Sequence, residues 1–463
     1  MPDRKEVRWR FCTLLVILLS VAVFQAATGH AQQQRETSAA ITPARVRLGE
    51  RLFRDARFAT PRGDLPASCA SCHLVNEDPQ GFRAYTDFFN RSWVSYRNSD
   101  PRRFELRNSP TIIDAALSPR LHYDGEFASL EALVKGTFSG RPMGWLPGEE
   151  TEAVTLLHNM VVNDKGDESG AGSYRELFSR AYNTDLSKLG REQVTDLVAR
   201  AVADFMRSLT SRRQSPYDQF IGANQLSTAP AANETPAAFG DRLLTAISRL
   251  EQSGNLKLTR EFNAVALRGL KLFMQTRGET GAGNCVTCHA PPMFTDYGFH
   301  NLGFSQVEYD LIHGEGQFAR VDIPDATQAK RPSAMLREIP DRKKPGAADL
   351  GYWNFVDLDK SPGKRAGESH DDFLRRMIGA VKTPGLRHLA YSYPYMHTGA
   401  YTTLEDTLAD LLRMSEMARQ GRVRAADEEL GRIRLDQTSI APLIAFLNTL
   451  NEDLRETLRG RYQ

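Results

Sequence analysis

The chain has 463 residues, of which 41% are hydrophobic and 25% are charged. This is the balance of an ordinary soluble globular protein with room for roughly two to four domains. The formal charge of +2 falls to zero without residues 1–31, which carry four basic and two acidic groups. That neutrality argues against nucleic acid or an anionic membrane surface as a partner.

Residues 1–31 resemble a secretory signal peptide. A basic start (Arg4, Lys5, Arg8 and Arg10) precedes a short apolar core over residues 11–24, and Gly29-His30-Ala31 offers small residues for cleavage. The alternative is an uncleaved membrane anchor, but the apolar run is shorter than the about 20 residues that a span needs. We therefore expect an exported protein with no membrane span after cleavage, in which Cys12 is lost with the signal.

The first mature segment predicts a helix that leads to a cysteine motif. Thr42 and Pro43 have the pattern of a helix cap followed by a first-turn proline. After a turn-rich stretch comes Cys69-Ala70-Ser71-Cys72-His73. The C-x-x-C-H spacing is that of covalent haem attachment, in which two thiols add to the haem vinyl groups and the histidine binds the iron.

The middle of the chain suggests where one domain ends. A helix is predicted over residues 191–209, because apolar residues recur there at helical spacing and should form core. Residues 223–237 are rich in Ala, Pro, Asn and Thr, which is typical of a boundary. We predict an N-terminal haem domain over residues 32–222 and a linker with a connecting helix over residues 223–262.

The remaining residues, 263–463, contain the second motif, Cys285-Val286-Thr287-Cys288-His289. A long polar insertion over residues 304–378 follows, and at that length it should be either a functional loop or a partly mobile segment. Helices are predicted over residues 403–419 and 439–450. Because little strand signal is present, we predict a mostly α fold with two tandem cytochrome c-like haem domains.

Alternatives to haem exist for an isolated C-x-x-C pair, which can be half of a zinc site or a redox-active dithiol. Here both pairs carry the histidine, and the chain after residue 31 has no other cysteine. The pairs of a zinc ribbon lie about 15–20 residues apart, whereas these lie in opposite halves of the chain. The sequence therefore predicts two covalently bound c-type haems.

The two halves also repeat each other after the haem motifs. Pro110, Gly125 and Leu130 align without a gap on Pro384, Gly399 and Leu404, and the match places Tyr123 opposite His397. This alignment predicts an internal duplication whose two haems work together. His397 is expected to contact the region between the haems or to make a structural hydrogen bond there.

These motifs resemble those of the bacterial di-haem cytochrome c peroxidase family, which includes the enzyme that matures methylamine dehydrogenase. The resemblance covers roughly residues 44–450, with insertions at 74–106, 140–190 and 304–378. Its motifs are Leu48-Gly49 with Leu52-Phe53, both C-x-x-C-H sites, Arg107-Asn108-Ser109-Pro110-Thr111, Tyr123-Asp124-Gly125, Thr383-Pro384-Gly385-Leu386-Arg387 and Pro394-Tyr395-Met396-His397-Thr398-Gly399.

The resemblance implies a division of labour between the haems. Hydrogen peroxide would bind at the haem on His73, and electrons would enter through the haem on His289. It implies a periplasmic location in a Gram-negative bacterium and an electron donor such as a small cytochrome c or a cupredoxin. Members of the family are often dimers.

Several residues depart from the family pattern near the first haem. Tyr123 replaces an inter-haem tryptophan, and a phenol relays an oxidising equivalent only by losing its proton. Leu133 and Thr137 replace the distal glutamine and proline, and Arg141 falls where a distal glutamate is expected. Arg141 could polarise peroxide but could not shuttle its proton, because its pKa is too high. No histidine follows His73 at the spacing of a removable ligand, so an open distal face is expected.

Two further metal sites follow from the resemblance. A calcium ion between the domains would use the side chain of Asn108 and the carbonyls of Ser392 and Pro394, which are the hard oxygen donors that calcium prefers. The alternative is that these residues only form ordinary turns.

The family's distal ligand of the second haem falls on Leu411, which cannot bind iron. Met414, one helical turn further, is the substitute; the alternatives are that Met414 is core or that this haem has no distal ligand.

The leading functional prediction is therefore peroxide reduction by an oxidoreductase. The replaced distal residues leave open a non-catalytic electron carrier or redox sensor. Oxidation of another substrate, bound by the open haem and the polar insertion, is the third alternative.

Overall fold

The computed structural model describes residues 41–62, 67–73, 76–78, 81–83, 107–166, 172–278, 280–361 and 363–453. The predicted signal peptide, Cys12 and most of segment 74–106 lie outside these residues. No helix within the described ranges is long and apolar enough to cross a membrane.

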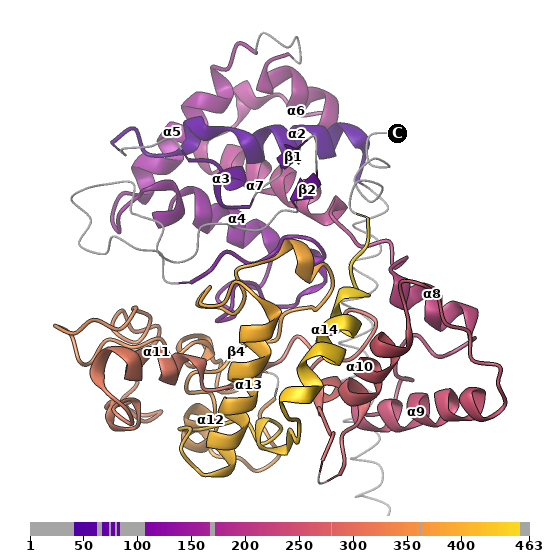
Figure 1. The fold of residues 1–463 in the computed structure, drawn as a ribbon. Coiled ribbons are helices and arrows are strands. Elements are labelled where there is room, and N and C mark those ends of the chain that lie inside the picture. The colour runs from indigo at the N-terminus through magenta and orange to yellow at the C-terminus, as the bar shows by residue number, and fades with distance from the viewer. Residues whose placement is uncertain are drawn as a thin grey trace, which may run out of the picture.

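The fold is mostly α-helical, as predicted (Figure 1). The helices are α2 (Pro43–Arg54), α3 (Cys69–Cys72), α4 (Leu130–Phe138), α5 (Glu150–Val162), α6 (Tyr174–Tyr182), α7 (Arg191–Ser208), α8 (Pro216–Ala223), α9 (Pro236–Gln252), α10 (Ala264–Met274), α11 (Phe304–His313), α12 (His370–Arg376), α13 (Leu404–Arg419) and α14 (Ile440–Asn448). Short 3₁₀ turns include η2 (Ala115–Leu117), η3 (Arg141–Met143), η5 (Cys285–Thr287), η7 (Tyr352–Phe355) and η8 (Leu389–Tyr391).

Strands are few and short. The strand β1 (Asn76–Asp78) pairs antiparallel with β2 (Gly81–Arg83). The strand β3 (Phe299–His300) pairs antiparallel with β4 (Val381–Lys382), with Phe299 opposite Lys382. The second pair joins the two ends of the long insertion.

The first helical group is built around the contact between α2 and α7. Thr42 caps α2 and Pro43 occupies its first turn, as the sequence predicted. A Cβ atom at Gly49 would lie 2.0 Å from the carbonyl oxygen of Ala201, so only glycine allows the two helices to approach this closely. The apolar face of α7 is buried against α2, α4 and α5, which confirms that the periodic residues of 191–209 are core.

The second group repeats this contact with α10 and α14. Asn263 caps α10, and a Cβ atom at Gly269 would lie 1.9 Å from the carbonyl oxygen of Pro442. Both halves therefore place a glycine of the first helix against the backbone of the last helix. The apolar cluster of the first half ends at Leu209 and that of the second begins at Tyr217, so α8 packs with the second half. The domain boundary expected near residue 223 stays a prediction.

The insertion 304–378 has a core of its own. Its buried aromatic residues are Tyr309, Phe318, Tyr352, Trp353 and Phe373, and the ring of Tyr352 stacks on Phe299 with centroids 3.7 Å apart. The insertion therefore contains a packed core, which the sequence did not indicate because its apolar residues are separated by long polar stretches. The expectation of a functional loop or a partly mobile segment stays a prediction. Figure 1 shows α11 on the side of the second group away from α8 and α9.

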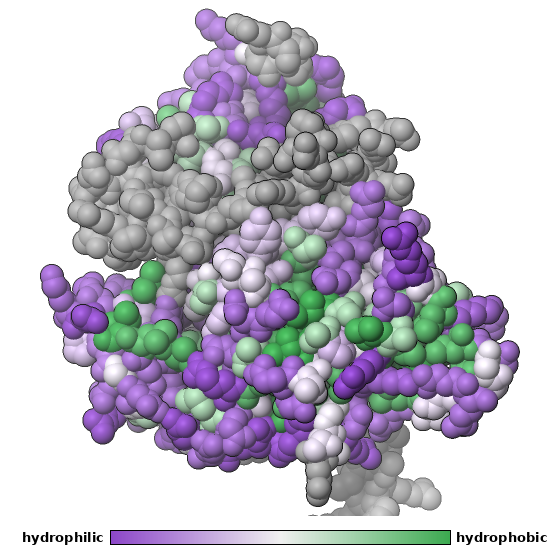
Figure 2. All heavy atoms as spheres, viewed as in Figure 1, coloured by the Kyte–Doolittle hydropathy of each residue, from purple (hydrophilic) through white to green (hydrophobic). Residues whose placement is uncertain are grey.

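The outer surface is mainly hydrophilic on the face shown in Figure 2. Apolar residues gather in a few patches, one of them over the region of α11. There the side chain of Leu311 is 77% exposed, and Ile312 and Met335 of the insertion are also exposed.

Candidate functional site

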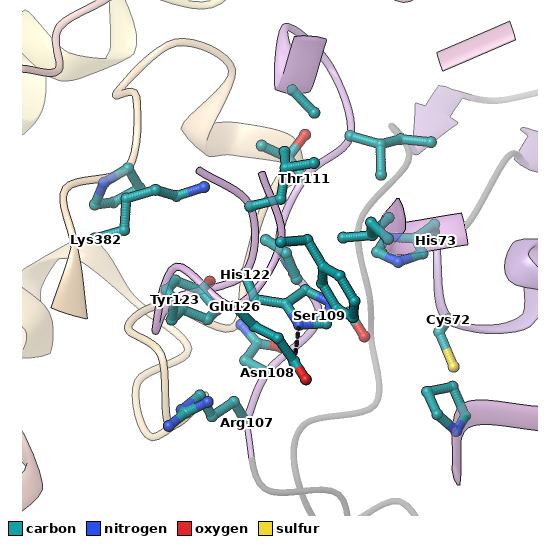
Figure 3. Close-up of a pocket in the computed structure, with 18 of the residues that line it drawn as sticks. Cys72, His73, Arg107, Asn108, Ser109, Thr111, His122, Tyr123, Glu126 and Lys382 are labelled. Atoms are coloured by element: carbon teal, nitrogen blue, oxygen red, sulfur yellow. Dashed lines mark hydrogen bonds and ion pairs between the residues drawn. The ribbon is translucent and has the colours of Figure 1, made fainter. Parts of the chain in front are cut away.

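A cavity of about 1280 Å³ lies where the two helical groups and the insertion meet. Its wall includes Cys69, Cys72 and His73, which come from the single turn of α3 and its C-terminal end. Figure 3 shows Cys72 and His73 in this wall. This volume exceeds the roughly 300–1,000 Å³ of most small-molecule pockets. The cavity can therefore hold a large planar group beside all three residues of the first C-x-x-C-H motif.

The second motif is presented by η5 with the same local geometry. The amide of His289 donates to the carbonyl of Cys285 at 2.8 Å, and the amide of His73 donates to the carbonyl of Cys69 at 2.8 Å. Nδ1 of His289 lies 2.8 Å from the carbonyl oxygen of Phe294. Such a carbonyl contact fixes the ring orientation of metal-binding histidines.

The chemistry of these residues fits haem attachment. Burial lowers the pKa of His73 to about 4, against the opposing effect of the Pro110 carbonyl, and so keeps the imidazole in the neutral form that binds iron. Nδ1 of His73 is buried without a hydrogen-bond partner among the described residues. Burial also raises the pKa of Cys69 and of Cys285 to about 12.

The aligned blocks after the two motifs share their backbone geometry. The bridge between Leu121 and Phe127 corresponds to the bridge between Tyr395 and Tyr401. Other matched features are left-handed residues (Asp114 and His388, His122 and Met396, Gly125 and Gly399), 3₁₀ turns (η2 and η8) and helix starts (Leu130 and Leu404). His73 and His289 also face the aligned carbonyls of Pro110 and Pro384.

Tyr123 and His397, the aligned pair between the predicted haems, lie next to each other. Their ring centroids are 6.2 Å apart and the rings are tilted by 60°. His397 is buried and its Nε2 lies 3.3 Å from Oγ of Ser305. The backbone amide of Lys382 donates to the carbonyl of Tyr123 at 2.7 Å, which ties the same loop to the second half.

A buried cluster of charges surrounds this contact. Arg107 donates to Asp124 at 2.6 Å and also binds Asp349, and Arg337 reaches Asp124 at 3.0 Å. Burial opposes ionisation of Asp349, but Arg107 outweighs it and lowers the pKa to about 2. No local pattern in the sequence predicted this cluster, because Arg337 and Asp349 lie inside the insertion, far along the chain from their partners.

The residues at the predicted distal positions all line the cavity of His73. Leu133 and Thr137 come from α4, and Arg141 opens η3. The hydroxyl of Thr137 donates to the carbonyl of Leu133 at 2.9 Å, so its proton is already engaged in a hydrogen bond within α4. Lys382 also faces the cavity, where burial lowers its pKa to about 8.

Two of the three residues predicted to bind calcium, Asn108 and Pro394, are in contact. Nδ2 of Asn108 donates to the carbonyl of Pro394 at 2.6 Å, and Ser392 lines the same cavity. Oδ1 of Asn108 is buried and has no partner among the described residues. Since amide oxygen and nitrogen are assigned from hydrogen bonding alone, the reverse orientation would direct Oδ1 towards Pro394 and give two hard oxygen donors.

Met414, the predicted substitute ligand, is fully buried in an apolar cluster with Phe304, Val423 and Leu430. A Cβ atom at Gly303 would lie 3.4 Å from its sulfur. This environment is that of the packing alternative, and iron ligation by Met414 stays a prediction.

Comparisons with known proteins point to one family. The family model described as "Di-haem cytochrome c peroxidase" matches residues 43–225. Cytochrome-c peroxidase IdrP2 from Pseudomonas sp. (strain SCT) is 27% identical over 415 residues, covering 89% of this chain and 82% of that protein. Methylamine utilization protein MauG from Methylorubrum extorquens is 24% identical over 413 residues, covering 89% and 80%.

Solved structures share the fold. The diheme peroxidase BthA from Burkholderia thailandensis superimposes with a TM-score of 0.54 at 18% identity, covering 91% of this chain and 87% of that one. A MauG-like protein associated with microbial copper homeostasis gives a TM-score of 0.51 at 22% identity, covering 91% and 93%.

Proposed function

Because this chain is a divergent member of the di-haem cytochrome c peroxidase family, we propose that it reduces hydrogen peroxide at a haem on His73. The electrons arrive through a second haem, on His289. The observation that carries the proposal is the large cavity that Cys69, Cys72 and His73 share with the loop of Tyr123. It offers room for both the cofactor and a small oxidant beside a route to the second half.

Each haem would supply the iron and the reversible redox change. Cys69 and Cys72 would attach the first haem and His73 would bind its iron. Cys285, Cys288 and His289 would do the same for the second haem. Thioether bonds hold each cofactor in one orientation. The protein's own contribution is then to orient peroxide, to move protons and to connect the two sites.

Arg141 and Tyr123 act next to the first haem, Arg141 on bound peroxide and Tyr123 in electron transfer between the halves. Arg141 lines the cavity, and its permanent charge stabilises negative charge on peroxide without exchanging a proton. Tyr123, 6.2 Å from the ring of His397, relays oxidising equivalents between the halves and releases its phenolic proton as it does so. Per peroxide, two electrons and two protons yield two water molecules.

The proposal includes the arrangement of the chain. Two duplicated haem domains lie within residues 32–222 and 263–463, supported by the matched turns, helix starts and glycine contacts. The helix α8, at the end of the first range, packs on the second half. A calcium ion binds Asn108, Ser392 and Pro394 between them. The protein works in the periplasm after removal of residues 1–31, and it receives electrons from a small cytochrome c or a cupredoxin, as a monomer or a homodimer.

Steady-state assays with the haem-loaded protein test this function. Oxidation of reduced cytochrome c or of a cupredoxin should depend on hydrogen peroxide and should be lost in His73→Ala. Because His73→Ala could also impair assembly, haem content and the intact mass are measured in parallel. Full haem loading without peroxide-dependent oxidation of any donor would refute the proposal.

The size and lining of the cavity favour one alternative, the oxidation of a larger substrate. Residues 337–342 of the insertion line the cavity together with His73.

The other alternative is a non-catalytic electron carrier, and spectra of the oxidised protein distinguish it from an enzyme. Two low-spin six-coordinate haems indicate an electron carrier, whereas a high-spin haem that reacts with peroxide indicates an enzyme.

A further inference from the structure

His122 and Glu126 face the cavity that contains His73. Nδ1 of His122 lies 3.1 Å from Oε2 of Glu126. In the view of Figure 3 this pair, joined by a dashed line, lies between Tyr123 and His73.

The backbone holds His122 in a conformation that few residues adopt. Its φ angle is +63°, in the left-handed region, and its ring packs edge-on against Phe127 with centroids 5.0 Å apart. The aligned Met396 has nearly the same φ angle, +66°, but carries a thioether, and Ala400 stands where the first half has Glu126. The acid–base pair is therefore present only in the half that would bind peroxide.

Charges from three segments fix the ionisation and position of Glu126. Burial opposes its ionisation, but the bond to His122 and the charge of Arg337 lower its pKa. Nη2 of Arg337 lies 3.1 Å from Oε2 of Glu126 and 3.0 Å from Asp124, which Arg107 also neutralises. An ionised Glu126 can only accept a hydrogen bond, so Nδ1 of His122 carries the proton and Nε2 is the basic nitrogen.

We propose that His122 is the acid–base catalyst of the peroxide reaction, with Glu126 and Arg337 as positioning residues; this rests on the function proposed above. Nε2 of His122 takes the proton from one oxygen of hydrogen peroxide and returns it to the other. The O–O bond then breaks and the second oxygen leaves as water. Two electrons from the donor and two protons from solvent complete the reduction to two waters. His122 thus supplies the proton transfer that Arg141 cannot.

Cyanide binding tests the proton transfer without turnover. Hydrogen cyanide binds a ferric haem as the anion, so a base in the cavity must accept its proton. In the fully haem-loaded chain we expect His122→Gln to slow both cyanide association and the reaction with peroxide by about 100-fold or more, the range of general acid–base catalysis. Glu126→Gln should slow both by about tenfold. His158→Gln, in α5 and outside the cavity lining, is the matched control.

Three results would overturn the proposal. The first is a His122→Gln protein with intact haem spectra and unchanged cyanide association. The second is a low-spin spectrum that becomes high-spin in His122→Gln while cyanide binds faster, which would make His122 an iron ligand. The third is a wild-type protein that binds cyanide but ignores peroxide. In that case the proposed function fails as well, and the cyanide rates still show whether His122 acts as a base.

Discussion

The ring of Tyr123 lies 6.2 Å from the ring of His397, and these residues occupy the same position in the two repeat blocks. Tyr123 lines the cavity of His73, whereas His397 is buried next to Ser305 of the second half. The pair therefore joins the proposed peroxide site to the half that would receive electrons.

Replacing Tyr123 tests this connection. A phenylalanine keeps the ring but has no proton to lose, so Tyr123→Phe should slow electron exchange between the haems at least tenfold, or about 1.4 kcal/mol in barrier height. Peroxide binding should be unchanged. Rapid-mixing spectroscopy of the two haems measures both steps. Tyr182→Phe, in α6, removes a phenol that binds Asp204 outside the cavity and serves as control; equal rates in both variants would rule out the relay.

Asp349 should contribute strongly to stability, because it is a buried partner of Arg107. Asp349→Asn should destabilise the folded protein by about 3 kcal/mol, since removing one member of a buried pair leaves the other charge less compensated. The exposed Asp372, 3.1 Å from Arg375, is the matched control, and Asp372→Asn should cost less than about 1 kcal/mol. Urea unfolding at neutral pH measures both values.

The acid stability of the same variant has a predictable sign. Arg107 holds the pKa of Asp349 at about 2 despite burial. A lowered pKa contributes stability that is present above the unfolded-state value of about 4 and is lost as the pH falls towards 2. The wild type should therefore lose more stability than Asp349→Asn between pH 4 and pH 2. Parallel acid-unfolding curves for the two proteins would contradict the ion pair.

His300 provides the opposite pH dependence. Burial opposes its charge, but Asp296 at 2.9 Å and Asp427 at 2.7 Å outweigh burial and raise its pKa to about 12. Stability from a raised pKa is fully present below the unfolded-state value of about 6.5 and is lost as the pH rises towards 12. His300→Gln should therefore cost about 2–4 kcal/mol at pH 6 and less at pH 10.

Chemical unfolding at both pH values tests this expectation. Cys288 as a free thiol also raises the pKa of His300, so the haem-loaded protein, in which this sulfur would be a thioether, measures the effect of the carboxylates alone. His370→Gln, at an exposed histidine 3.4 Å from Asp359, is the control and should change little. A cost for His300→Gln that grows with pH would contradict the assignment.

Calcium should stabilise the junction between the two halves. At a free concentration of 100 times the dissociation constant, one bound ion would add about 2.7 kcal/mol. Removing calcium with a chelator should therefore lower the melting temperature of the wild type but not that of Asn108→Ala. Asn159→Ala, on the exposed face of α5, should keep the calcium response. Metal analysis that finds no calcium would remove this part of the account.

The sequence predicted those features that depend on local patterns. The cap at Thr42 and the periodic apolar face of α7 were both visible, because each depends on residues that are close in the sequence. The structure adds that Gly49 and Gly269 are points of close helix contact in the two halves.

The parts that the sequence did not predict depend on distant partners. Arg107 and Asp349 are 242 residues apart, so no local pattern joins them. The aromatic core of the insertion was not predicted, because it is assembled from residues scattered along the segment. His122 was seen only as part of the repeat, since it pairs with Glu126, four residues on, through a left-handed turn and not along a helix.

The most direct test of the central claim is a peroxide titration of the protein with both haems reduced. One equivalent of hydrogen peroxide takes up two electrons, so the account predicts that it oxidises both haems of one chain completely, in step with loss of the reduced haem absorption. No further oxidation should follow with more peroxide. Haems that remain reduced after one equivalent, or oxidation of the His289 haem in a His73→Ala protein at the wild-type rate, would contradict peroxide reduction at His73.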